Sequence, residues 1–233
     1  PLNIKQKIAL VGPLANDEFH IIGNWSAQGR RDGIAVSVKE GFEAKGSKFN
    51  YAKGCEITEG DSSGFANAIA IAKSSDVVVM VMGESEGMSG EAASRTNIKL
   101  PALQQKFISE IRKIGKPIVL VLFNGRPLDL SWENETVDAI VETWFSGTNG
   151  GHAIADVLFG DYNPAGRLPV TFYKSVNDLP DFKNYNMENR TYKYFKGEPL
   201  FPFGHGLSYT NFTYSNLDIK EANIINEPIE VKV

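Results

Sequence analysis

The chain has 233 residues, of which 42% are hydrophobic and 22% are charged, so it is long enough to bury the core of one ordinary globular domain. Its 24 basic and 28 acidic residues give a formal net charge of −4, which disfavours nucleic-acid binding because no broad basic field can form. No apolar run is long enough to cross a bilayer, so we expect no membrane-spanning segment.

The two ends of the sequence predict a piece of a longer protein. The first residues, from Pro1 to Lys5, contain neither an initiator methionine nor an apolar signal segment. The last residues, from Glu230 to Val233, have the composition of an interrupted strand. We therefore expect further protein on both sides of this chain.

Short apolar runs rich in β-branched residues recur along the chain and predict strands. Their hydrophobicity is continuous rather than alternating, which is typical of strands covered on both faces. Helical stretches of matching length lie between them, the clearest beginning at Pro101 and stopping before Gly115. The predicted strands are residues 8–11, 49–52, 77–82, 118–123 and 139–145, and the predicted helices are residues 31–43, 64–74, 101–114 and 151–159.

This alternation predicts an α/β fold with a mostly parallel sheet flanked by helices on both faces. Ligands of such folds bind at the carboxyl ends of the strands. From residue 208 the pattern changes to alternating polar and apolar residues, so we expect residues 1–207 to form the α/β domain and residues 208–233 to begin an all-β module. Residues 162–206 are rich in Pro, Gly, Asn and aromatics, which predicts ordered loop with a short strand at residues 168–172.

The segment after the third predicted strand carries the most chemistry. Residues 83–95 read GESEGMSGEAASR and contain the carboxylates of Glu84, Glu86 and Glu91. A carboxyl group at that edge of the sheet can act as a general acid and base if its surroundings hold a proton near neutral pH. A solvated acidic loop explains the same composition, and spacing alone does not choose between the two.

Other chemistries find no support in the sequence. The first predicted strand leads into VGPLAN rather than a dinucleotide fingerprint, and there is no Walker-type phosphate loop. His20, His152 and His205 lack metal-ligand spacing, so we expect them to cap or pack. Cys55, the single cysteine, fits a small buried hydrophobe. We therefore predict no cofactor and no metal.

Several motifs in a fixed order resemble the C-terminal α/β domain of glycoside hydrolase family 3, in particular its bacterial periplasmic β-glucosidases. The resemblance covers nearly the whole chain and ends in the family's exit into a fibronectin-type-III-like domain. The matching blocks are SGEAASR at residues 89–95, IKLP at 98–101, QQ at 104–105, GKPIVLVL at 115–122, NGRP at 124–127, ETWFSGT at 142–148, ADVLFGDYNP at 155–164, GRLP at 166–169, YF at 194–195 and LFPFGHGLSYT at 200–210.

The resemblance implies a retaining, exo-acting hydrolase of terminal β-linked glucose in β-glucosides or oligosaccharides. In such an enzyme an Asp nucleophile on an N-terminal (β/α)8-type barrel attacks the sugar, while a glutamate of the α/β domain serves as general acid and base. We assign that role to Glu91, which precedes Arg95 by four residues, with Glu84 as second choice and Glu86 as third. The barrel is absent here, so the isolated chain is expected to be inactive. The resemblance also implies a periplasmic or secreted protein.

Trp25 and Met88 are the predicted substrate-binding residues. The segment GNWSAQG at residues 23–29 resembles the aglycone side of the family's pocket, where an indole ring can stack on a sugar or leaving group. A core tryptophan at the start of a helix is the alternative. Met88 is expected to pack at the pocket rim. Asn124 and Arg126 are expected to shape loops, and Trp132 and Trp144 to lie in the core or an interface.

A second hypothesis is a non-catalytic sugar-binding or docking module whose loop carboxylates hold sugar hydroxyls or support another domain. A nucleotide-binding domain is disfavoured by the missing phosphate loops. The sequence leaves open the choice between glucoside and xyloside, the linkage and the oligomeric state.

Overall fold

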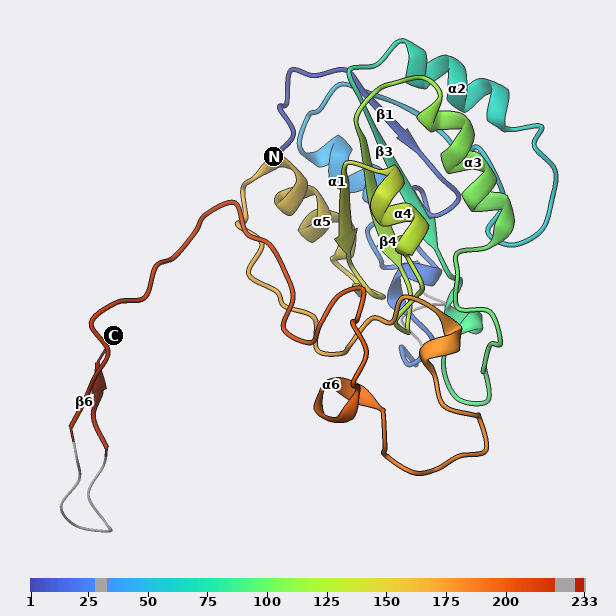
Figure 1. Cartoon of the computed structure of the whole chain (residues 1–233). Coiled ribbons are helices and arrows are strands. Elements are labelled where there is room, and N and C mark those ends of the chain that lie inside the picture. The colour runs from blue at the N-terminus through green and yellow to red at the C-terminus, as the bar shows by residue number, and fades with distance from the viewer. Residues whose placement is uncertain (28–32, 221–228, 233) are drawn as a thin grey trace.

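Parallel strands form the centre of the computed structural model, which describes residues 1–27, 33–220 and 229–232. Within these residues five strands make one sheet in the order β2-β1-β3-β4-β5, and every neighbouring pair is parallel (Figure 1). This confirms the sheet predicted from the continuous apolar runs. The strands are β1 (Ile8–Val11), β2 (Phe49–Ala52), β3 (Val77–Gly83), β4 (Ile118–Phe123) and β5 (Ala139–Glu142).

Helices cover both faces of the sheet, as predicted. The short helix α4 (Ser131–Thr136), which the sequence patterns did not predict, lies beside α3 (Figure 1). One face is covered by α1 (Val38–Ala44) and α5 (Gly150–Phe159), and the other by α2 (Phe65–Lys73) and α3 (Ala102–Arg112).

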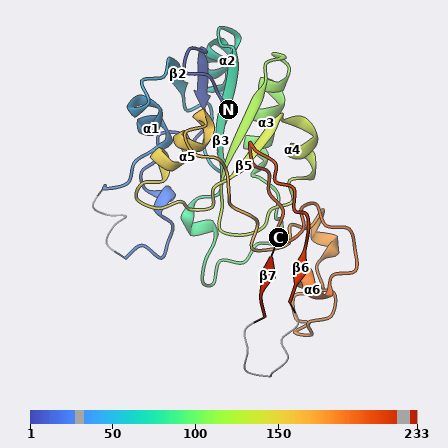
Figure 2. The ribbon, with the colours of Figure 1, turned by 90° about the vertical axis from the view of Figure 1, so that its left-hand side faces the viewer.

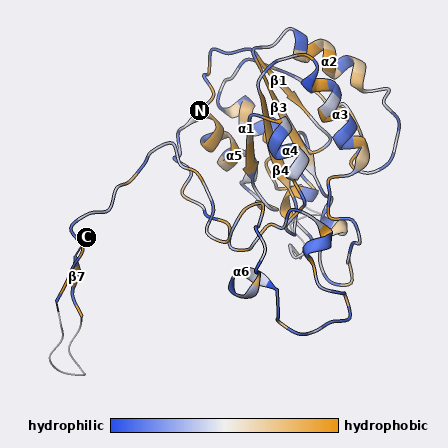
Figure 3. Ribbon diagram, in the orientation of Figure 1, coloured by the Kyte–Doolittle hydropathy of each residue, from blue (hydrophilic) through white to orange (hydrophobic). Residues whose placement is uncertain are grey.

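Strands β1, β3 and β4 are apolar throughout because each of their two faces lies in a separate core. Alternate side chains point to opposite faces, so Ala9 and Val11 pack with α2 and α3 while Ile8 and Leu10 pack with α1 and α5. Hydropathy colouring shows the same pattern, with hydrophobic strands between helices that turn polar residues outward (Figure 3). Phe107 and Ile111 of α3 are fully buried, as the spacing of its apolar residues predicted.

Cys55 is buried among these apolar side chains, as expected. Burial raises the pKa of its thiol to about 12. The thiolate is therefore scarce at neutral pH, and the side chain serves packing.

Two predicted boundaries were wrong. The helix predicted at residues 31–43 begins at Val38, because Ser37 accepts a hydrogen bond from the Glu40 backbone N–H and the Glu40 carboxylate accepts one from Ser37. Residues 31 and 32 lie outside the described residues. The strand predicted to reach residue 145 ends at Glu142, since Trp144 has a φ of 53° and its N–H donates to the Glu142 side chain.

The strand predicted at residues 168–172 is also wrong, because this segment makes only an isolated antiparallel bridge. Phe172 pairs with Phe201, and the Leu168 N–H donates to the His205 carbonyl at 2.8 Å. Pro169, which has no N–H, lies between these contacts and cannot contribute to a continuous ladder.

The C-terminal residues form an antiparallel pair, β6 (Asp218–Ile219) and β7 (Val231–Lys232), which stands apart from the parallel sheet (Figure 2). This pair fits the start of a β module, whereas the domain boundary at residue 208 stays a prediction.

The remaining elements are the 3-10 helices η1 (His20–Ile22), η2 (Glu86–Met88) and η3 (Val176–Asp178) and the short α6 (Thr191–Tyr194). In the part of the chain described here, no helix has the length and apolarity to span a membrane.

Gly83, the last residue of β3, should tolerate no side chain. Its φ is +135°, and an added Cβ would lie 1.8 Å from the Phe123 carbonyl oxygen of β4. We expect Gly83→Ala to lower the free energy of unfolding by about 3 kcal/mol or more, measured by urea denaturation of the chain. Gly166→Ala is the control, since that site has open space and an ordinary φ. Equal unfolding midpoints for the two variants would contradict the expectation.

Candidate functional site

The candidate site lies at the carboxyl edge of the sheet, between β1 and β3. With the strand order β2-β1-β3-β4-β5 the chain reverses its direction of winding there, and such switch points are where α/β sheets bind ligands. The segments that leave β1 and β3 contain η1 and η2, which lie side by side in both ribbon views (Figures 1 and 2). The Glu86 N–H donates to His20 Nδ1 at 3.4 Å, and Asn24 Nδ2 donates to the Ser89 carbonyl at 2.9 Å.

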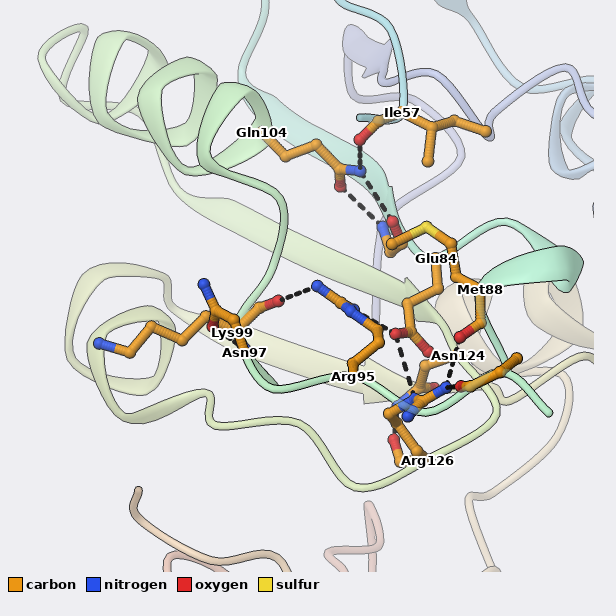
Figure 4. Close-up of polar contacts among 11 residues, drawn as sticks. Ile57, Glu84, Met88, Arg95, Asn97, Lys99, Gln104, Asn124 and Arg126 are labelled. Carbon is orange, nitrogen blue, oxygen red and sulfur yellow. Dashed lines mark hydrogen bonds and ion pairs between the residues drawn. The ribbon is translucent and has the colours of Figure 1, made fainter. Parts of the chain in front are cut away.

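Glu84, the first residue after β3, is completely buried and paired with two arginines. Arg95 Nη1 donates to Glu84 Oε1, and Arg126 Nε lies 3.4 Å from the same oxygen. These three side chains converge from different segments (Figure 4). We name them the buried ion cluster. Removing one partner of such a pair typically costs about 3–5 kcal/mol, because the remaining charge stays buried.

This arrangement separates the roles of the candidate carboxylates. Arg95, four residues after Glu91, pairs with Glu84 and not with Glu91. Glu84 has no surface that a substrate could reach, whereas Glu91 is exposed to solvent farther along the same loop. The buried ion cluster thus joins the two ends of the segment that presents Glu91. The assignment of an acid/base role to Glu91 stays a prediction.

Arg126 also holds the middle of this loop. Its Nη2 donates to the Met88 carbonyl and, at 2.6 Å, to the Ala93 carbonyl (Figure 4). The two carbonyls lie on either side of Glu91 in the sequence. Arg126 therefore shapes the loop, as expected for this residue.

Gln104 anchors the beginning of the same loop. This fully buried side chain accepts from the Gly83 N–H at 2.8 Å and donates to the Gly83 carbonyl at 2.7 Å and to the Ile57 carbonyl at 2.6 Å. The strand end that carries Glu84 is thereby tied to α3. Sequence reasoning noted Gln104 only as part of a matching block and gave it no role.

The conformation and surroundings of Gly90 account for the glycine in the SGEAASR motif. Its φ is +129°, and an added Cβ would lie 1.8 Å from Asn24 Nδ2. The close approach lets Asn24 reach the neighbouring Ser89 carbonyl and brings the loop of Trp25 against the loop of Glu91. The φ of residue 90 therefore favours glycine directly before Glu91, and a Cβ there would displace the Asn24 amide.

Trp25 is 78% exposed, so the interpretation as a core residue is wrong. It lies on the η1 side of the two adjoining loops, and Met88 is half-buried on the η2 side. The structure thus brings together the segments of Trp25, Met88 and Glu91. Trp144 is partly buried against the core, as expected, while Trp132 is 38% exposed.

Glu142 is a titratable group at this edge whose role sequence reasoning missed. Burial raises its pKa to about 8; hydrogen bonds from the Trp144 N–H and Asn124 oppose this shift, and the charge of Glu84 adds to it. Asn124 Nδ2 donates to Glu142 Oε2 at 3.2 Å and to the Arg126 carbonyl at 2.8 Å. A signal was available in the sequence, since Glu142 interrupts an otherwise apolar strand.

Among the described residues, no group of three or more His, Cys, Asp or Glu side chains is placed to hold a metal ion. His205 stacks on Phe201 with ring centroids 5.0 Å apart, in keeping with a packing role.

Residues 1–209 match the family model described as the glycosyl hydrolase family 3 C-terminal domain. The chain belongs to glycoside hydrolase family 3. It is 44% identical to a periplasmic β-glucosidase of Salmonella typhimurium over 94% of this chain and 33% of that protein. It is 38% identical to a β-xylosidase of Formosa agariphila over 96% of this chain and 33% of that protein. The chain thus spans about a third of the length of these family 3 relatives.

The fold of this family 3 domain is also similar to a solved structure, the β-glucosidase of Listeria innocua in complex with isofagomine. The TM-score is 0.81 at 32% sequence identity, and the match covers 95% of this chain and 32% of that one. The overall fold of this chain is therefore shared with part of a β-glucosidase.

The raised pKa of Glu142 makes stability depend on pH. Below the ordinary value of 4.5 the carboxyl is protonated in both folded and unfolded chains, and between 4.5 and about 8 only the folded chain keeps the proton. The free energy of unfolding should therefore fall as the pH rises through this window, by at most about 1.4 kcal/mol per pH unit from this group. Urea unfolding at several pH values measures the slope.

Glu142→Gln should flatten that slope, because glutamine does not titrate. Glu135→Gln, which replaces an exposed glutamate of α4, should leave the slope as it is. Identical slopes in the wild type and the Glu142→Gln variant would contradict the assignment.

Proposed function

We propose that this chain is the α/β domain of a retaining, exo-acting β-glucosidase and that Glu91 is its general acid and base. The nucleophile is an Asp on an N-terminal (β/α)8-type barrel of the same enzyme. The observation that carries the proposal is the exposed Glu91 at the switch point of the sheet, on a loop that the buried ion cluster holds at both ends. Membership of family 3 supports it.

Retaining hydrolysis needs two carboxyl groups about 5 to 5.5 Å apart. Glu91 protonates the leaving oxygen while the Asp attacks the anomeric carbon, and Glu91 then takes a proton from the water that releases the sugar. Because Glu91 lies in solvent, the barrel must cover it to exclude bulk water and bring in the second carboxylate. This chain alone is therefore inactive.

Trp25 and Met88 form the substrate-binding side of the proposed site. The exposed indole of Trp25 offers an apolar face on which a sugar ring or leaving group can stack. Met88 is half-buried on the loop that carries Glu91 and adds a deformable apolar contact at the rim.

The exposed aromatic residues of the C-terminal third support docking of the barrel on this chain. Phe182, Tyr185, Phe212 and Tyr214 are each at least 77% exposed. Exposed rings of this size are candidates for contact with another domain. The segment of residues 176–195, with Phe182 and Tyr185, lies beyond the carboxyl edge of the sheet, whereas the C-terminal segment after residue 210 extends away from the sheet (Figure 1).

The enzyme acts in the periplasm or outside the cell, a proposal supported by the periplasmic β-glucosidase to which this chain is similar. Its substrates are β-glucosides or oligosaccharides with a terminal glucose. Of these two matches, each of which covers at least 94% of this chain, the β-glucosidase has the higher identity, which supports glucose over xylose.

Glu91→Gln in the full-length enzyme tests the acid/base role. Loss of the acid should lower kcat for substrates with poor leaving groups by about 10²–10⁴-fold, while aryl glucosides with activated leaving groups still form the glycosyl-enzyme. Added azide should then restore turnover of the activated substrates, because it replaces the water that Glu91 no longer activates. Steady-state kinetics across a leaving-group series measures both effects.

Glu86→Gln on η2 is the matched control, since it removes a carboxylate from the same loop. If Glu91→Gln is tolerated and the chain binds glucose without any role in hydrolysis, the non-catalytic sugar-binding module is the better description. If Glu86→Gln shows the leaving-group dependence and Glu91→Gln does not, the role moves to Glu86.

Substrate preference is tested separately with matched aryl β-glucoside and aryl β-xyloside. The full-length enzyme should have the higher kcat/KM for the glucoside, because a glucose site gains contacts to the hydroxymethyl group that xylose lacks. A higher kcat/KM for the xyloside would contradict glucose specificity while leaving the role of Glu91 untouched.

A further inference from the structure

We propose that Arg126 is a positioning residue for the reaction: its guanidinium sets the place of the loop around Glu91 through the carbonyls of Met88 and Ala93. This inference rests on the proposed function, because it deepens the account of the same site. Arg126 itself is not expected to touch substrate.

The contacts of Arg126 lie on both sides of Glu91. Nη2 donates to the Met88 carbonyl before Glu91 and to the Ala93 carbonyl after it. One nitrogen therefore holds the carbonyls of Met88 and Ala93 close to each other. Glu91 lies in the part of the loop between these two residues. A shift of the guanidinium must move the carboxyl group of Glu91 relative to the sheet.

The loop has little to hold it in place on its own. Its internal backbone bonds are short-range, such as Met88 N–H to Ser85 at 3.0 Å and Ala93 N–H to Gly90 at 3.3 Å. These bonds stabilise single turns and do not connect the loop to the sheet. The ties from outside the loop to residues 86–93 come from Arg126, from Asn24 and from His20.

Arg126 is itself fixed from two directions. Glu84 Oε1 lies 3.4 Å from its Nε, and Asn124 Nδ2 donates to its carbonyl at 2.8 Å. Asn124 also donates to Glu142 at the end of β5. Both the main chain and the side chain of Arg126 are therefore connected to residues at the ends of strands. Contacts therefore connect the ends of β3, β4 and β5 to the loop of Glu91 through Arg126.

An arginine suits this role better than a lysine. The planar guanidinium can form an ion pair with Glu84 through Nε while Nη2 donates to two carbonyls, and the geometry between these nitrogens is fixed. A lysine ammonium is a point charge on a flexible stem and cannot keep all three contacts at these positions. Catalytic groups need placement to about 0.5 Å, and a displacement of about 1 Å can cost about 100-fold in rate.

Hydrogen exchange of the chain tests the mechanical part of the proposal. Arg126→Met should raise amide exchange of residues 86–93 by about tenfold or more, while the amides of β3 and β4 keep their protection. Arg126→Lys should give an intermediate increase. Arg112→Met is the control, because Arg112 is an exposed arginine that pairs with Asp138 at 3.3 Å far along α3.

Unchanged exchange in the loop, or an equal rise throughout the domain, would overturn the proposal. If Arg126→Met does not fold, Arg126→Gln, which keeps one amide donor, is measured with the same expectations. These measurements need no activity and so remain valid whether or not Glu91 is the acid.

Kinetics of the full-length enzyme test the catalytic part. Arg126→Met should lower kcat for glucosides with poor leaving groups by about 100-fold and for activated aryl glucosides by less than about tenfold, with KM nearly unchanged. Arg126→Lys should recover part of the loss. In the Glu91→Gln background the further change should be small, because both substitutions act on one group.

The outcomes separate the two proposals. Positioning by Arg126 is refuted if kcat of Arg126→Met depends on the leaving group as it does in the wild type, while kcat of Glu91→Gln depends on it strongly. No leaving-group dependence in Glu91→Gln refutes the acid/base assignment and leaves the exchange data to decide what Arg126 does to the loop.

Discussion

The carboxyl edge of this domain depends on one buried carboxylate and the two guanidinium groups that surround it. Glu84 follows β3, Arg126 follows β4, and Arg95 ends the loop that leads toward α3. A charge removed from water is tolerated when oppositely charged groups and hydrogen bonds replace the solvent. The cluster therefore determines how these three segments pack against one another. The position of the loop with Glu91 depends on that packing.

Glu142 extends this electrostatic arrangement to β5. Burial and the charge of Glu84 together raise its pKa to about 8, so the side chain is mostly uncharged at neutral pH. A neutral Glu142 adds no second negative charge to the cluster and still accepts hydrogen bonds from Asn124 and Trp144. The domain thus pairs Glu84 with two arginines and places the mostly uncharged Glu142 beside them.

Much of the fold could be predicted from the sequence because the strands are short, apolar and separated by helices with clear periodicity. The errors came from local signals that were overlooked. Ser37 and Glu40 form a capping box that starts a helix later than its apolar pattern suggests. Pro169 interrupts pairing that the flanking residues would otherwise allow.

The candidate site was harder to predict in detail, because Glu84, Glu86 and Glu91 are chemically identical and close in sequence. What distinguishes them is the burial of Glu84 against Arg95 and the distant Arg126, which no spacing rule contains. The family resemblance located the loop, and the tertiary structure shows which carboxylate is enclosed and which faces solvent. Glu142 and Gln104 were missed for the same reason, since their importance comes from partners outside their own segments.

The environment of Cys55 has a practical consequence for spectroscopy. It is the single cysteine of the chain, and its enclosed thiol will react slowly with maleimides and iodoacetamides, which require the ionised sulfur. A cysteine introduced at a solvent-facing position can therefore carry a fluorophore or spin label without prior removal of the native one. Distances between such labels would report loop motion in the otherwise unmodified molecule.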